Sequence, residues 1–243
     1  MSDEEICELL KKNVITDSES AAYIQSRGFD LGLELCEADV IEHLVMREKY
    51  TDQPIKSGHS ETNFASIFAK GYGKNSFITK IPSSAAVLGT YLSHDLLERK
   101  SDSSESPYGY SSVILKTNYG GTLAVMACGF WKLTCHSTQR DRILDVIDYL
   151  GQMPARILSP SRVLLMPRVD EEGKTVAVSV TNCTVAYPEG VKIKIRSPKG
   201  KRFTFVSQYD GECTLDFEET NDGYIVELPR LSAWSVSTVF CDK

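Results

Sequence analysis

The first 158 residues alternate between helical and strand-like patterns of hydrophobic positions. Ser2 and Glu5 form a capping box, and the apolar stripe that follows predicts a short helix that ends near Asn13. Two further helices are predicted, one over residues 17–28 and one over residues 138–151. The strand-like runs between them are LGLEL, SFITKI, AAVLGTYL, YSSVILKT and TLAVMA.

After residue 158 the period changes to two, so that every second residue is hydrophobic. Turn signals such as Asp222-Gly223 separate several of the runs, and short alternating strands at this spacing favour an antiparallel β-sandwich. Trp234 alternates with Val236 and Phe240, which predicts that its ring lies in the sandwich core. The seven runs are RVLLMPRV, KTVAVSVTN, GVKIKIR, RFTFVS, ECTLDF, GYIVELP and AWSVSTVF.

The change of period divides the chain into an α/β domain over residues 1–158 and a β-sandwich over residues 159–243. Hydrophobic residues make up 42% and charged residues 25%, which is typical of a soluble globular protein. No apolar run approaches the roughly 20 residues of a membrane helix. The acidic start MSDEEICELL also lacks the basic region of a secretory signal. We therefore expect a cytoplasmic protein that does not contact a membrane.

The formal net charge is −6, which does not favour nucleic-acid binding. One segment is nevertheless rich in cations, and its first three cations alternate with apolar residues, as on a half-buried strand whose charges face water. We interpret the segment as a solvated face rather than a ligand site, because a ligand site needs a surface on which the charges converge. The cations are Lys192, Lys194, Arg196, Lys199, Lys201 and Arg202.

The seven cysteines show no C-x-x-C spacing, so they are expected to be reduced thiols. Cys183, Cys213 and Cys241 lie in strand-like runs, where a free cysteine usually acts as a small buried hydrophobe. The four histidines show no metal-binding spacing either, so we expect no metal and no cofactor.

Cys135 and His136 are the candidates for nucleophilic catalysis, since they precede a predicted helix. A catalytic cysteine at a strand-to-helix turn usually lies between glycines, whereas here the neighbours are Thr134 and Ser137. Residues adjacent on a strand also point in opposite directions. We favour an inert loop, and a small cysteine-dependent hydrolase remains an alternative.

Aromatic residues gather around the tight hairpin predicted at Gly120-Gly121. Exposed rings stack on sugar faces, so this group is the candidate carbohydrate-binding site, and packing in a core or an interface is the other interpretation. The candidate residues are Tyr108, Tyr110, Tyr119 and Trp131.

Several segments together resemble a known family. They are DEEICELLKKNVITDSESAAYIQSRG, TNYGGTLAV and RDRILDVIDYL in the first domain, and LLMPR, VAVSVTN and ELPRLSAWS in the second. The pattern is similar to the C-terminal part of multidomain glycoside hydrolases related to family 42 beta-galactosidases. In that family a catalytic barrel precedes a glutamine-amidotransferase-like "trimerisation" domain and a small β-sandwich. The resemblance implies an incomplete flavodoxin-like first domain, because the opening strand and helix are missing.

The resemblance also bears on function. Glycosidase chemistry uses two carboxylates held in the barrel, and a barrel needs about 250 residues, for which this chain has no room. We therefore expect a non-catalytic structural or oligomerisation module from the tail of a longer protein. The implied partners are a catalytic barrel or sister subunits in a homo-oligomer. The alternative is a carbohydrate-binding protein that acts alone.

Overall fold

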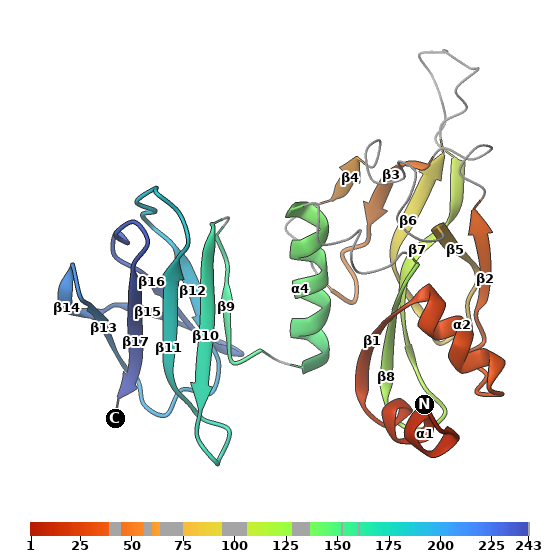
Figure 1. Ribbon diagram of the computed structural model, residues 1–243, viewed down its shortest axis with the longest axis horizontal. Helices are drawn as coiled ribbons and strands as arrows, with labels where there is room; N and C mark the ends of the chain where they lie inside the picture. Colours follow the sequence, from red (N-terminus) through yellow and green to blue (C-terminus); the bar gives the residue numbers. More distant parts are fainter. Residues whose placement is uncertain are drawn as a thin grey trace, which may run out of the picture. The chain divides into compact units, whose positions relative to one another are not determined.

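The computed structural model in Figure 1 describes residues 1–38, 45–55, 60–63, 75–93, 106–127, 137–151, 153–159 and 161–242. The chain forms two compact units, Met1–Gly151 and Gln152–Lys243. Strand β9 (Ala155–Ile157) pairs with β12 (Lys192–Ile195) of the second unit, although the sequence pattern had placed the residues of β9 in the first domain.

The first unit combines helices with one mixed sheet in the order β1-β8-β7-β6-β3-β4. Strand β5 also pairs with β7, and β2 pairs with β5. The predicted capping box between Ser2 and Glu5 is present, and the Asp17 carboxylate accepts a hydrogen bond from the backbone N–H of Ser20. The helices are α1 (Asp3–Leu10), α2 (Ser18–Ser26) and α4 (Ser137–Gly151). The strands are β1 (Asn13–Asp17), β2 (Glu34–Ala38), β3 (Val45–Tyr50), β4 (Glu61–Asn63), β5 (Asn75–Lys80), β6 (Ala86–Ser93), β7 (Ser106–Lys116) and β8 (Thr122–Met126).

The sheet is covered on both faces, which explains why β8 is buried at every position. Alternate residues of β7 and β8 enter different apolar clusters, as the two-residue period of a strand requires. Val113 and Leu123 pack with residues of α1 and α2, whereas Ile114 and Ala124 pack with residues of α4. The first unit is therefore a layered α/β structure rich in strands.

The flavodoxin-like arrangement implied by the family resemblance is not confirmed. A flavodoxin-like sheet is built from parallel strands. Among the described strands only β1 and β8 pair in parallel, and the remaining ladders of this sheet are antiparallel. The coarser prediction of an α/β domain holds, with more antiparallel pairing than the resemblance implies.

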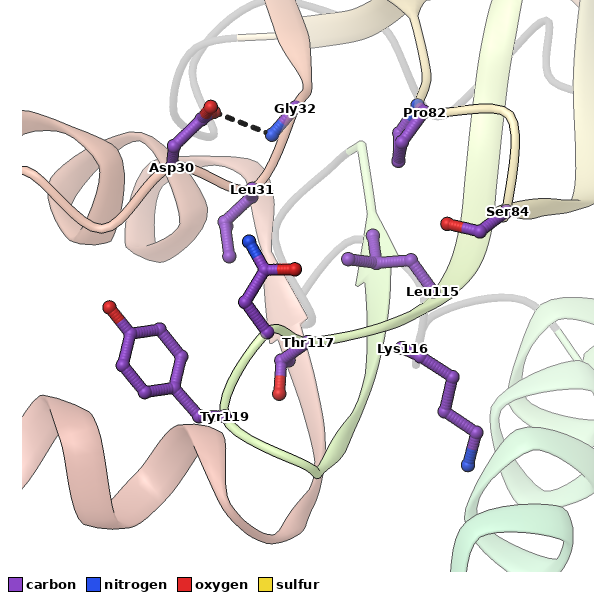
Figure 2. A pocket seen from close by; sticks show the side chains of 10 residues that line it. Asp30, Leu31, Gly32, Pro82, Ser84, Leu115, Lys116, Thr117 and Tyr119 are labelled. Atoms are coloured by element: carbon purple, nitrogen blue, oxygen red, sulfur yellow. Dashed lines mark hydrogen bonds between the residues drawn. The ribbon is translucent and has the colours of Figure 1, made fainter.

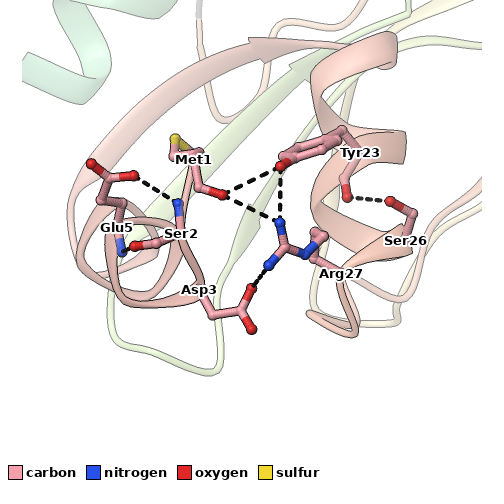
Figure 3. Close-up of polar contacts among 7 residues, drawn as sticks. All are labelled: Met1, Ser2, Asp3, Glu5, Tyr23, Ser26 and Arg27. Carbon is pink, nitrogen blue, oxygen red and sulfur yellow. Dashed lines mark hydrogen bonds and ion pairs between the residues drawn. The ribbon is translucent and has the colours of Figure 1, made fainter.

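A group of polar contacts holds the first two helices together (Figure 3). The guanidinium of Arg27, the residue that follows α2, donates to the backbone carbonyl of Met1 at 3.3 Å and to the Tyr23 hydroxyl at 3.1 Å, and it forms an ion pair with Asp3. Because these groups lie at the surface, they contribute little to the free energy of unfolding. We infer that they orient α1 against α2.

The second unit is the predicted antiparallel β-sandwich. Its two sheets have the orders β10-β11-β17-β13-β14 and β15-β16-β12-β9. The core between them contains fully buried residues from both sheets, among them Ile193, Phe203 and Val239. The remaining strands are β10 (Val163–Val169), β11 (Thr175–Asn182), β12 (Lys192–Ile195), β13 (Arg202–Ser207), β14 (Gly211–Leu215), β15 (Phe217–Thr220), β16 (Gly223–Glu227) and β17 (Val236–Asp242).

Two details of the sandwich differ from the sequence prediction. The run ECTLDF forms two strands, because the chain crosses at Asp216 from β14 in one sheet to β15 in the other. Trp234 is 67% exposed and has a φ of 53°, so its predicted place in the core is wrong. Val239 and Cys241 fill the core instead. Because successive residues of a strand face opposite sides, burial of these two residues places Val236 and Phe240 on the outer face.

The cysteines of the second unit differ in burial. Cys241 is buried as expected, and that burial raises the pKa of its thiol to about 12. Cys183 is partly buried, and Cys213 is exposed, contrary to the prediction. Cys213 lies on β14 at the edge of its sheet, where cover from neighbouring strands is incomplete.

The cation-rich segment follows the predicted alternation, with Ile193 and Ile195 fully buried between its charged residues. Lys194 and Arg196 both pair with Asp222, at 2.5 Å and 2.8 Å. The hydrogen bond from Lys194 and the neighbouring Arg196 lower the pKa of Asp222 to about 2. The cations thus serve local ion pairs on the sandwich surface.

Candidate functional site

The hairpin between β7 and β8 is tied firmly to the end of α1. The Thr117 hydroxyl donates to the backbone carbonyl of Leu10 at 2.6 Å, and the Gly121 N–H donates to the same carbonyl at 3.1 Å. A β-carbon on Gly121 would lie 2.2 Å from the Lys12 carbonyl oxygen, so only glycine fits there. Gly120 beside it has a φ of 97°, the left-handed region that glycine adopts without strain.

A cavity of about 200 Å³ opens beside this hairpin (Figure 2). Segments distant in sequence line it: the loop after α2, the turn between β5 and β6, and the end of β7. Asp30 accepts a hydrogen bond from the Gly32 N–H at 2.7 Å, which fixes the loop after α2. Tyr119 adds an aromatic ring to the same lining, whereas the Lys116 side chain points away from the cavity and donates a hydrogen bond to the Thr122 hydroxyl at 2.7 Å (Figure 2). The cavity therefore offers a carboxylate and a phenol ring to a small polar ligand.

Tyr119 is one of the predicted carbohydrate-binding residues, and it lines this cavity with 39% of its surface exposed. Its ring centroid lies 5.6 Å from that of Phe29, with the rings tilted by 53°. This contact supports the ring on one side and leaves part of it accessible. A sugar face could stack on the accessible part.

The other predicted site residues do not join Tyr119 in the cavity lining. Tyr110 is half-buried and packs against the cluster between the sheet and α1 and α2. Tyr108 lies on β7, and its side chain is outside the described part of the structure. Trp131, Cys135 and His136 lie outside the described residues, so their predicted roles stay predictions.

The largest fully buried side chain of the described residues is that of Arg142 on α4, which is 1% exposed. Its guanidinium donates to the backbone carbonyls of Ile55, Leu88 and Thr51, at 3.1, 3.0 and 3.3 Å. It also lies over the Tyr50 ring, 5.2 Å from the centroid. Arg142 thereby joins α4 to the sheet and to the segment after β3, a role that the sequence pattern gave no sign of.

Glu48 on β3 is a second buried ionisable residue, with 3% of its surface exposed. Its carboxylate accepts hydrogen bonds from the Ser111 hydroxyl and, at 3.4 Å, from the Gln139 amide. A β-carbon on Gly89 would press on this group, since it would lie 2.8 Å from a Glu48 oxygen. Burial raises the pKa of Glu48, and the hydrogen bonds and the charge of Arg142 oppose that rise only in part.

The raised pKa of Glu48 predicts a pH dependence of stability. The group contributes stability below its ordinary pKa of 4.5, and this contribution is lost as the pH rises toward the folded-state pKa. Glu48→Gln cannot ionise, so its stability relative to the wild type should rise by up to about 1.4 kcal/mol per pH unit within that window. Urea unfolding of both proteins across the pH range measures this difference. A difference independent of pH would show that Glu48 does not titrate abnormally.

Arg142 and Glu48 contact protein groups rather than the lining of the hairpin cavity. Perturbed ionisable groups often mark catalytic sites, but they also occur in structural networks. Because the described contacts of these two residues join α4 to the sheet, we assign them to the scaffold. The candidate site for a ligand is the hairpin cavity.

The comparison with known proteins shows a solved structure with a similar fold but no matching family. No protein-family model matches the sequence, and no curated protein matches it. Among solved structures, alpha-L-fucosidase isoenzyme 2 from Paenibacillus thiaminolyticus has a similar fold, with a TM-score of 0.61 and 11% sequence identity. The likeness covers 100% of this chain and 39% of the fucosidase chain, so this chain spans well under half of that enzyme's length.

None of the helices in the described part of the chain combines the length and the apolar character needed to cross a membrane. The described residues also contain no cluster of three or more histidine, cysteine, aspartate or glutamate side chains arranged to hold a metal ion. The four histidines lie outside the described ranges.

Proposed function

We propose that this chain is a non-catalytic structural module of a glycoside-hydrolase-related protein, and that it holds subunits or domains together. The observation that carries the proposal is the fold likeness to the fucosidase, which extends over both units of this chain. At 11% identity the likeness concerns the fold, so the structural role and the glycosidase context are inferred. We also propose that the protein is cytoplasmic and that its first unit is related to the amidotransferase-like trimerisation domain.

The first unit offers surfaces suited to association. Strand β1 ends the order of its sheet and pairs with β8 alone among the described strands, and an edge strand is a common place for another chain to pair. A hollow of about 450 Å³ lies beside it, lined mainly by apolar side chains of α1, β1 and α2, including Leu9, Val14 and Ile24. Open edges and apolar hollows are common at protein contacts.

Sedimentation velocity of the purified chain over a concentration series tests the associating role. We expect the weight-average sedimentation coefficient to increase with concentration and to approach that of a small oligomer. A coefficient that stays at the monomer value across the series would contradict self-association. The structural role would then require a different partner.

Carbohydrate binding at the hairpin cavity is a second candidate function. The observation that favours it is the position of Tyr119, whose partly exposed ring lines the cavity together with Asp30. A ring with a neighbouring carboxylate can stack on the apolar face of a sugar while the carboxylate accepts hydrogen bonds from its hydroxyls.

Tyr119→Ala tests this second function. If sugar binds here, the variant should bind β-galactosides or fucosides about fivefold more weakly, because one stacked ring contributes about 1 kcal/mol. Isothermal titration calorimetry with a sugar panel gives the affinities. Tyr209→Ala, which removes another exposed tyrosine from the second unit, is the matched control and should bind like the wild type. No heat from any sugar with the wild type would exclude the function.

A further inference from the structure

We infer that two copies of this chain associate through the outer face of the sheet β10-β11-β17-β13-β14. The inference rests on the proposed associating function and names the surface that performs it. Four apolar side chains are exposed on this face although they belong to regular strands: Leu164 (60%), Met166 (58%), Val236 (57%) and Phe240 (41%). The outer face of an antiparallel sandwich sheet usually carries polar residues, so this face is unusual.

The strand register places these side chains in adjoining rows. Leu164 lies opposite Thr181, which lies opposite Val236. The next row runs across the sheet from Met166 through Ser179 and Thr238 to Val206. In the third row Phe240 lies between Ala177 and Thr204. On β10, β11, β17 and β13 the first two rows contain only apolar residues, serine and threonine.

The absence of charge from these rows favours a second copy as the occupant. The whole chain carries a net charge of −6, so most ways of packing two copies bring like charges together. This face avoids that repulsion, because each copy presents uncharged rows to the other. Its apolar groups are mostly aliphatic, which suits packing against a protein better than stacking on a sugar ring.

The size of the face is sufficient for a weak dimer. Five strands about 4.8 Å apart and three rows about 7 Å apart cover roughly 500 Å² per copy. The total of about 1,000 Å² lies at the lower limit for specific protein interfaces. We therefore expect a reversible dimer whose population depends on concentration.

Symmetry and charge at the edges define how the copies meet. Strand β17 is the central strand of the sheet, so a two-fold axis along β17 places β10 of one copy over β14 of the other. Arg168 projects from β10 in the third row and Glu212 from β14 in the second. The two-fold arrangement brings Arg168 of one copy within side-chain reach of Glu212 of the second copy. Opposite charges thus meet at both edges of the dimer.

Val236→Lys tests the face directly, with Val185→Lys as the matched control. Both valines are exposed, at 57% and 75%, but Val185 lies outside the strands of this sheet. Sedimentation velocity should show that Val236→Lys raises the dissociation constant about tenfold or more, because two lysines meet near the axis and lose apolar contact. Val185→Lys should associate like the wild type. Circular dichroism establishes that both variants are folded.

The edge charges provide a second test, which does not depend on apolar contact. Arg168→Glu alone and Glu212→Arg alone should each weaken the homodimer, because each places like charges at both edges. A mixture of the two variants should form heterodimers of wild-type affinity, since opposite charges face each other again.

The outcomes separate this inference from the proposed function. If the wild type associates but Val236→Lys and the edge variants do not change its affinity, a different surface mediates association. In that case the inference fails and the proposed function stands. If the wild type stays monomeric at every concentration, the inference fails together with self-association, and the structural role would require a different partner. Loss of association in Val236→Lys together with rescue in the mixture supports both.

Discussion

Arg142→Met should destabilise the first unit by about 3–5 kcal/mol, the largest effect we expect from a single substitution. The guanidinium donates to the carbonyls of Ile55, Leu88 and Thr51, and methionine would remove all three hydrogen bonds, although the Leu88 carbonyl would keep its bond from the Thr51 N–H. The contact with the Tyr50 ring would also be lost. Methionine keeps much of the volume of the side chain, so the loss would reflect the hydrogen bonds more than a cavity.

Urea unfolding monitored by tryptophan fluorescence measures this effect. Each unit has one tryptophan, Trp131 or Trp234, so a Trp234→Phe background reports on the first unit alone. Arg140→Met on the same helix is the matched control, because Arg140 is exposed and should change stability by no more than about 0.5 kcal/mol. Equal stabilities of the two variants would show that Arg142 does not join α4 to the sheet.

Gly121→Ala should cost about 3 kcal/mol, because its methyl group would overlap the backbone at the end of α1. The β-carbon would lie 2.2 Å from the Lys12 carbonyl oxygen and 2.3 Å from that of Leu10, and neither atom can move without the chain. The hydrogen bond from the Gly121 N–H to Leu10 would be lengthened as the hairpin withdraws.

Gly120→Ala separates this overlap from backbone strain. Gly120 has a φ of 97° and open space around its α-carbon, so alanine there should cost only the strain of about 1–2 kcal/mol. Thermal unfolding of both variants gives the comparison. A smaller loss for Gly121→Ala than for Gly120→Ala would mean that the hairpin does not press against the end of α1.

The sandwich could be predicted from the sequence because its strands alternate strictly and turn residues separate many of them. Trp234 shows the limit of that reasoning: it continues the alternation toward Val236, yet the set that contains it faces outward. Alternation identifies two faces of a strand, and the covering sheet decides which one is buried. The exposed Val236 and Phe240 follow from the same choice of face.

The first unit was predictable in its helices and less so in its sheet. The α2 N-cap at Asp17 follows from local side-chain chemistry, which the sequence displays. Strand β1 was missed because its five residues lie between two helices, and Asn13, expected to end the first helix, begins this strand. The pairing of β1 with β8 joins residues about a hundred positions apart, which no local pattern reveals.

The buried ionisable residues could not be found from the sequence. A charged residue on an amphipathic helix or in a strand is normally interpreted as exposed, and nothing adjacent to Arg142 on α4 or to Glu48 on β3 indicates otherwise. Their partners come from separate strands and loops, so only the fold brings them together. Tyr119 is a predicted site residue because it adjoins the glycine pair of the hairpin. The cavity beside it depends on Asp30 and Pro82, which come from other segments.

The measurement that tests the central claim most directly is the mass of the native polypeptide in the source cell. An antibody raised against this chain would be used in a denaturing immunoblot. We predict a band well over twice as heavy as 27.0 kDa, since the chain corresponds to 39% of the fucosidase chain. A band at 27.0 kDa would contradict the claim that this chain is the structural module of a larger glycoside-hydrolase-related protein.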